Sequence, residues 1–175
     1  RMEEFYNPKM ILKYFPSGTL SIKALKTYLD NLEGYYNFVP DIILLDYLDL
    51  MEIDSDKKRI ELGETAVDLR GIAGERNLAM VTVAQTNKEG EGKQILTRKN
   101  LAEDFSKVMT ADYLLTINAT EYEKNLGLMR LYVDKARNSK EGSLTLISQN
   151  LSIGQFCLNS LKFSNNYKSL LENNK

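Results

Sequence analysis

The sequence predicts an α/β fold, with a mostly parallel sheet flanked by helices and antiparallel strands at the C-terminal end. Between residues 8 and 118, apolar segments of strand length alternate with segments whose apolar residues recur at helical spacing. Strands that alternate with helices are typical of a parallel sheet covered by helices. After residue 118, strand patterns follow one another with turn-rich segments between them, which indicates an antiparallel extension.

The first half of the chain is expected to contain two central strands. Residues 41–47 (DIILLDY) and 79–84 (AMVTVA) are almost continuously apolar, the pattern of strands buried on both faces. Thr19 or Ser21 can cap a helix that continues to about residue 36. The remaining segments predict a strand at 8–15, a turn at 16–18, a polar loop at 51–60 and a helix at 62–76.

The second half is expected to begin with a long polar loop and to end in strands. In chain order, the patterns predict a loop at 86–99, a short helix at 101–111, and strands at 113–118, 128–135, 143–148 and about 153–158. Residues 160–175 are polar and are expected to form a short helix or a disordered end.

Composition excludes several classes of chemistry. The 175 residues include no histidine, which removes Ser-His-Asp and Cys-His nucleophiles and nearly every zinc site. Any metal is therefore expected to be a hard cation such as Mg²⁺. The single cysteine allows no internal disulfide, which fits a reducing cytosol. The net charge of −1 does not by itself indicate nucleic acid, so any DNA contact would come from local loops.

Two polar residues lie at the ends of the expected parallel strands, where ligands bind in open α/β sheets. Asp46 follows an apolar run, and in P-loop ATPases such a carboxylate holds the Mg²⁺ that bridges the β- and γ-phosphates. Its alternative role is to cap a loop. Gln85 could touch a γ-phosphate and a mobile loop, or could simply be solvated.

Basic residues form three further candidate groups. Lys135 and Arg137 are separated by one residue on an extended segment, so their side chains point the same way. Both could therefore reach a neighbouring subunit's nucleotide. The two polar loops carry the other groups, in positions suited to contact a DNA backbone. These residues are Lys57, Lys58 and Arg59 in the first loop, and Lys88, Lys93, Arg98 and Lys99 in the second. The alternative for each group is a solvated surface.

The sequence contains no phosphate-binding motif G-x-x-x-x-G-K-[ST]. The nearest partial match to this motif is at Gly92-Lys93, but Asn87 stands in place of the first glycine and Gln94 replaces Ser or Thr. No GxGxxG motif occurs either.

Several segments together resemble the DnaB-type replicative DNA helicases of bacteria and phages. The resemblance is carried by PDIILLDYLDLM (40–51), AMVTVAQTNK (79–88), TADYLLTI (110–117) and DKARNSKEGSLTL (134–146). KYFPSGTLSIKAL (13–25) is similar to phage members of the family. Order and spacing agree over roughly residues 8–158, although the segment FSKVMTAD (105–112) has fewer matching residues.

The resemblance implies a RecA-like P-loop ATPase core, with residues 1–158 as part of that domain and 159–175 as a polar tail. It makes Asp46 the Walker B carboxylate that holds Mg²⁺. Tyr47 would lie beside the ATP, and Gln85 would couple the nucleotide to the DNA loops. Lys135 and Arg137 would reach the adjacent subunit's ATP. The implied partners are single-stranded DNA and identical subunits in a hexameric ring, with a primase or helicase loader as further candidates. The implied location is the cytoplasm of a bacterium or of a phage's host, without a membrane.

The chain departs from the family in one respect. The family's first strand, its P-loop and the general-base glutamate of the next strand would all precede Arg1. We therefore expect these residues alone not to hydrolyse ATP, and the sheet to have an unsatisfied edge or a missing central strand. Two alternatives remain open: a RecA- or KaiC-type ATPase that is not a helicase, and a non-catalytic adaptor that binds DNA or a helicase subunit.

Overall fold

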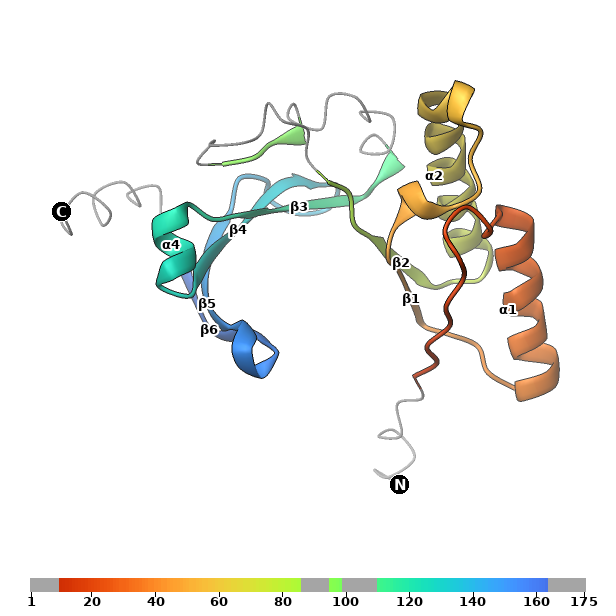
Figure 1. Cartoon of the computed structure of the whole chain (residues 1–175), viewed down its shortest axis with the longest axis horizontal. Coiled ribbons are helices and arrows are strands. Elements are labelled where there is room, and N and C mark those ends of the chain that lie inside the picture. Colours follow the sequence, from red (N-terminus) through yellow and green to blue (C-terminus); the bar gives the residue numbers. More distant parts are fainter. Residues whose placement is uncertain (1–9, 86–94, 99–109, 164–175) are drawn as a thin grey trace.

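The computed structural model describes residues 10–85, 95–98 and 110–163 (Figure 1). In the described residues, the elements are α1 (Ile22–Tyr36), β1 (Ile42–Leu45), η2 (Leu48–Leu50), η3 (Ser55–Lys57), α2 (Lys58–Glu75), β2 (Ala79–Thr82), β3 (Tyr113–Asn118), α4 (Glu121–Asn125), β4 (Leu128–Ala136), β5 (Leu144–Asn150), η6 (Leu151–Ile153) and β6 (Gln155–Phe163). The 3-10 helices are denoted η. No helix in these ranges is long and apolar enough to cross a bilayer.

Strands β1 and β2 pair in parallel, with Ile42 opposite Ala79 and Leu45 opposite Thr82. Figure 1 shows α1 and α2 together on one side of this pair. The core lies between these helices and the strands. Its buried members are Leu20, Leu25, Leu29, Leu32, Leu48, Met51, Leu62, Leu69 and Ile72, with Ile43, Leu45 and Met80 packed against them.

The other face of the same strand pair is not covered by described residues. Ile42, Leu44 and Val81 are 53%, 69% and 46% exposed. The prediction that both strands are buried on both faces is therefore wrong for this part of the chain. The reason is that the described helices pack on one face only.

Local chemistry explains where α1 begins and ends. The Ser21 side chain accepts the Ala24 N–H at 3.2 Å, which satisfies one of the free donors at the helix start. Leu25, Leu29 and Leu32 are buried on one face, as the sequence predicts. The helix ends at Asn37, which adopts a left-handed conformation with φ of 48°.

Strands β3 to β6 form an antiparallel sheet in the order β3-β4-β5-β6, which confirms the predicted antiparallel strands. The last strand, β6, continues beyond the expected end near residue 158 to Phe163. Helix α4 was not predicted. It begins at a capping box in which the Thr120 side chain accepts the Glu123 N–H and the Glu123 side chain accepts the Thr120 N–H.

The described strands thus form two separate sheets, because no pairing links β2 to β3 among them. The expectation of an unsatisfied edge or a missing central strand stays a prediction. The predicted strand at 8–15 is not formed at residues 10–15, since Met10, Leu12 and Tyr14 are exposed and unpaired within the described residues. Phe15 alone packs inward, edge-on to Tyr28. Most of the predicted helix at 101–111 lies outside the described residues.

Candidate functional site

The carboxyl ends of β1 and β2 form one edge of the parallel pair. Thr82 donates its hydroxyl hydrogen bond to the Leu45 carbonyl at 3.0 Å, which ties the two strand ends together. Asp46 follows β1 directly, and Gln85 lies shortly beyond the end of β2; both are exposed. The structure therefore brings the two predicted polar residues to the same edge of the sheet.

The chain after Asp46 is held firmly by backbone bonds. Leu50 and Met51 close a 3-10 turn over Tyr47 and the buried Leu48. The Leu50 carbonyl accepts the Gly18 N–H at 2.8 Å, which ties this turn to the segment before α1. The backbone that follows the exposed Asp46 is thus tied to neighbouring segments, and Tyr47, the next residue, is half-buried. The peptide bond between these two residues is cis.

Asp46 has the properties of a residue that holds Mg²⁺ together with phosphates and water. Among the described residues it forms no ion pair, and no cluster of three or more His, Cys, Asp or Glu side chains gathers anywhere in them. Mg²⁺ bound with nucleotides commonly takes only one or two protein carboxylates. A single exposed and uncommitted carboxylate fits that donor set. The sequence supplies no phosphate-binding loop beside it.

Lys135 and Arg137 belong to the second sheet. Lys135 lies opposite Leu114 on β3, next to a β-bulge in which Asp134 is the extra residue. Arg137 follows β4, and its side chain is 60% exposed. Its backbone N–H donates to the Asp112 carbonyl at 2.9 Å, and its Nη1 donates to Asp112 Oδ1 at 2.8 Å. Arg137, which was predicted to reach a neighbouring subunit's nucleotide, is therefore anchored at the start of β3.

A second contact group fixes the residues around Lys135. The Asp134 carboxylate, which is buried, accepts the Arg98 Nε at 3.1 Å, and Arg98 Nη2 donates to Glu141 at 2.9 Å. Glu141 also accepts the Ala136 N–H at 3.2 Å. That backbone N–H first, and Arg98 second, hold the pKa of Glu141 below its ordinary value. The hydrogen bond from Arg98 to Glu141 is the main reason why the pKa of Arg98 is raised.

The basic residues predicted to contact DNA are in different environments. Lys57 ends η3 and is exposed. Lys58 and Arg59 lie in the first turn of α2, so the predicted loop at 51–60 is shorter than expected. The 3-10 turn η3 leads directly into α2, and Glu61 in the first turn of α2 accepts the Asp54 N–H at 2.7 Å. Arg98 is bound to carboxylates of this chain, whereas Lys88, Lys93 and Lys99 lie outside the described residues.

Sequence reasoning missed Asp112 and Arg70. Asp112 Oδ1 accepts not only Arg137 but also Arg70 Nη2 from α2, at 3.0 Å. These partners are separated from Asp112 by 25 and 42 residues, so no local spacing could have revealed them.

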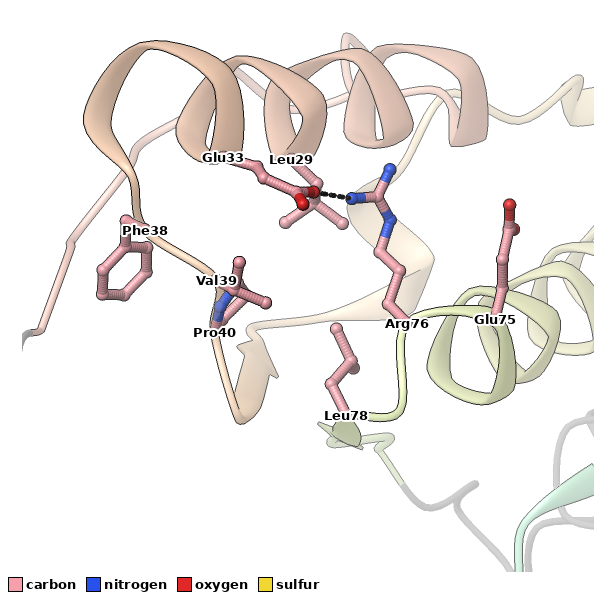
Figure 2. A pocket seen from close by; sticks show the side chains of 8 residues that line it. All are labelled: Leu29, Glu33, Phe38, Val39, Pro40, Glu75, Arg76 and Leu78. Carbon is pink, nitrogen blue, oxygen red and sulfur yellow. Dashed lines mark ion pairs between the residues drawn. The ribbon is translucent and has the colours of Figure 1, made fainter.

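A small pocket lies at the opposite end of the parallel pair, where the strands begin. Its volume is about 200 Å³, below the range of roughly 300–1,000 Å³ that is usual for ligand sites. Figure 2 shows the ion pair between Glu33 and Arg76 above its apolar residues. The lining residues are Leu29, Glu33, Phe38, Val39, Pro40, Glu75, Arg76 and Leu78. The pocket therefore does not coincide with the edge that carries Asp46 and Gln85.

Comparison with known proteins gives consistent matches. The family described as DnaB-like helicase C terminal domain matches residues 2–156. A DnaB-like replicative helicase of Enterobacteria phage T4 is 28% identical over 118 residues, which are 65% of this chain and 25% of the phage protein. The chain therefore spans a quarter of the length of that curated relative.

Two solved structures share the fold. The ATPase domain of G40P superposes with a TM-score of 0.67 at 16% identity, covering 83% of this chain and 52% of that one. A structure of a DnaB-like replicative helicase and its interactions with primase gives a TM-score of 0.65 at 16% identity, with coverages of 78% and 34%. The chain thus shares the fold of these two structures.

Proposed function

Because the chain belongs to the DnaB-like helicase C-terminal domain family, we propose that it forms part of the ATP-driven motor of a replicative helicase that translocates on single-stranded DNA. The observation that carries this proposal is the exposed carboxylate of Asp46 at the carboxyl end of β1, which forms no ion pair with the part of the chain that the structure describes. The family match favours this function over a RecA- or KaiC-type ATPase of another kind and over a non-catalytic adaptor.

In this proposal, Asp46 and Tyr47 lie beside the Mg²⁺ and the phosphates of ATP in the same subunit. When bound, Mg²⁺ neutralises charge on the phosphates during their transfer. Asp46 contributes one fixed carboxylate to it. The 175 residues contain no phosphate-binding loop, so no group among them is assigned to the phosphates themselves. Gln85, at the same edge, couples the nucleotide that is bound to the residues that follow it in the sequence.

Lys135 and Arg137 are proposed to act on the ATP of the adjacent subunit. Arg137 is exposed and anchored at Asp112 on the second sheet, whereas Asp46 lies at the edge of the first. This separation supports action across an interface between identical subunits in a ring. Cationic fingers of this kind stabilise the charge that develops during phosphoryl transfer.

The single-stranded DNA is proposed to contact two groups of basic residues that follow the strands of the first sheet in the sequence. Lys57, Lys58 and Arg59 form one group, and Lys88, Lys93 and Lys99 the other. Arg98 also belongs to the second group. It is expected to contribute least to DNA binding, because its side chain is already bound to Asp134 and Glu141. A primase or helicase loader, and a cytoplasmic site of action, follow from the family and belong to this proposal.

Mixing of subunits tests the assignment of Asp46 in cis and Arg137 in trans. In the assembled helicase that contains these residues, Asp46→Asn and Arg137→Ala should each abolish DNA-stimulated ATP hydrolysis while nucleotide binding by Arg137→Ala persists. A mixture of the two inactive proteins should regain hydrolysis, because some interfaces then combine an intact Asp46 with an intact Arg137. Lys140→Ala, which changes an exposed cation nearby, is the matched control. Loss of nucleotide binding in Arg137→Ala, with the turnover per bound nucleotide retained, would contradict the finger role.

A further inference from the structure

The carboxylate of Asp112 holds two arginines that come from different parts of the fold. Its Oδ1 accepts Arg137 Nη1 at 2.8 Å and Arg70 Nη2 at 3.0 Å. The main-chain carbonyl of Asp112 also accepts the backbone N–H of Arg137 at 2.9 Å. A single residue therefore fixes Arg137 at both its backbone and its side chain.

This contact uses only one corner of the Arg137 guanidinium. The bond to Asp112 is made by Nη1, and within the described ranges Nε and Nη2 of Arg137 donate no hydrogen bond. An arginine side chain offers five donors in a rigid planar fork. A guanidinium that is held through Nη1 is oriented by that bond and still has Nε and Nη2 as donors for an incoming phosphate oxygen.

The charge balance of the cluster also favours an anion. One carboxylate faces two guanidinium groups, so the cluster keeps a net positive charge. Arg70 is held independently, because its Nη1 donates to the Thr110 carbonyl. If Arg137 moved towards a phosphate, Asp112 would keep Arg70 as a cationic partner and would not be left with an uncompensated charge.

We propose that Asp112, supported by Arg70, is the positioning residue for Arg137 and sets the angle at which its free donors meet a phosphate of the neighbouring subunit's ATP. This inference rests on the proposed role of Arg137. Precise placement matters for such a group, because a displacement of about 1 Å can cost roughly a hundredfold in rate.

The test compares ATP hydrolysis by variants of the assembled helicase. Asp112→Asn removes the charge but keeps the shape of the side chain, and should lower kcat roughly ten- to a hundredfold with KM changed less than about twofold. Added to Arg137→Ala, it should cause no further loss of the residual hydrolysis that remains without DNA, because Asp112 acts through Arg137. Asp112→Glu restores a carboxylate and should recover part of the activity. Glu121→Gln, on an exposed side chain that is 83% accessible, is the matched control.

Three outcomes separate the inference from the proposed function. If Arg137→Ala lowers kcat but Asp112→Asn does not, the positioning role is wrong. If Asp112→Asn causes a further loss in the Arg137→Ala background, Asp112 acts by another route and the inference fails. If Arg137→Ala itself leaves hydrolysis unchanged, the finger role in the proposed function is wrong. Should Asp112→Asn not fold, Arg70→Gln gives the same comparison, with a smaller expected drop in kcat and the same absence of further loss with Arg137→Ala.

Discussion

Arg130 on β4 donates from Nη2 to Glu123 on α4 at 2.8 Å, and the two side chains are only 1% and 2% exposed. The same Glu123 carboxylate accepts the backbone N–H of Thr120 at 2.7 Å and its hydroxyl at 2.9 Å. A short helix that has little apolar surface is thus joined to the sheet by a buried ion pair.

Removal of one partner should be costly, because it breaks a hydrogen-bonded ion pair that is almost fully buried. We expect Glu123→Gln to lower the free energy of unfolding by roughly 3–5 kcal/mol. Urea denaturation followed by circular dichroism measures this change. Glu121→Gln on the same helix removes an exposed pair with Lys124 and should change the stability by less than about 1 kcal/mol. Equal effects of the two substitutions would show that the pair is not buried.

At Gly127, which precedes β4, two backbone segments approach closely, and a substitution there tests this contact. It has φ of +65°, and a Cβ added there would lie 2.8 Å from the Gln149 carbonyl oxygen. Gly127→Ala should therefore destabilise the chain by about 1–3 kcal/mol. Gly71→Ala is the opposite control, because Gly71 lies in α2 with nothing within 4 Å of an added Cβ. That change should stabilise the chain by about 0.5–1 kcal/mol.

The lowered pKa of Glu141 predicts that the stability of the chain depends on pH. The Ala136 N–H and Arg98 favour the charged carboxylate, so the pKa of Glu141 in the folded chain lies below its ordinary value of 4.5. A lowered folded pKa adds stability that is present above the ordinary value and is lost as the pH falls through the folded value. The melting temperature of Glu141→Gln should therefore lie below that of the unchanged protein near neutral pH, and the gap should close below pH 4.5.

A gap that stays constant down to acid pH would mean that the charge of Glu141 does not contribute to this difference. Glu64→Gln, on an exposed position of α2, is the matched control.

The uncovered apolar face of β1 and β2 predicts self-association or low stability of the isolated chain. Leu44 is the most exposed of its members. We expect gel filtration to give a dimer, or thermal melting to give a broad transition at low temperature. Leu44→Lys should shift a dimer towards monomer, whereas Val67→Lys, an exposed apolar position on α2, should not. A monomer that melts sharply would contradict this prediction.

Nucleotide binding by the 175 residues alone is a further test. A fluorescent ATP analogue with Mg²⁺, titrated into the purified chain, should not bind tightly, because one carboxylate without a phosphate-binding loop gives little affinity. Tight binding that depends on Mg²⁺ would reveal a nucleotide site that neither the sequence nor the described geometry identifies.

The features that could be predicted from the sequence depend on local pattern. Asp46 and Gln85 were predicted at one edge because parallel strands end on the same side of a sheet. Thr120 and Glu123 have capping-box spacing, so α4 could have been predicted as well. The contacts of Asp112 could not, since they join residues that are distant in the sequence. The early start of α2 was missed because its first residues are charged and resemble a loop.

The contact between Arg70 and Asp112 also bears on how the two sheets move relative to each other. It links α2, which packs on the first sheet, to the start of β3 in the second. Both side chains are partly exposed, and such a pair contributes only about 0–1 kcal/mol. A rotation between the sheets therefore meets little resistance from this bond. Because Arg137 and Asp112 both belong to the second sheet, their bond can persist in such a rotation while the bond to Arg70 breaks.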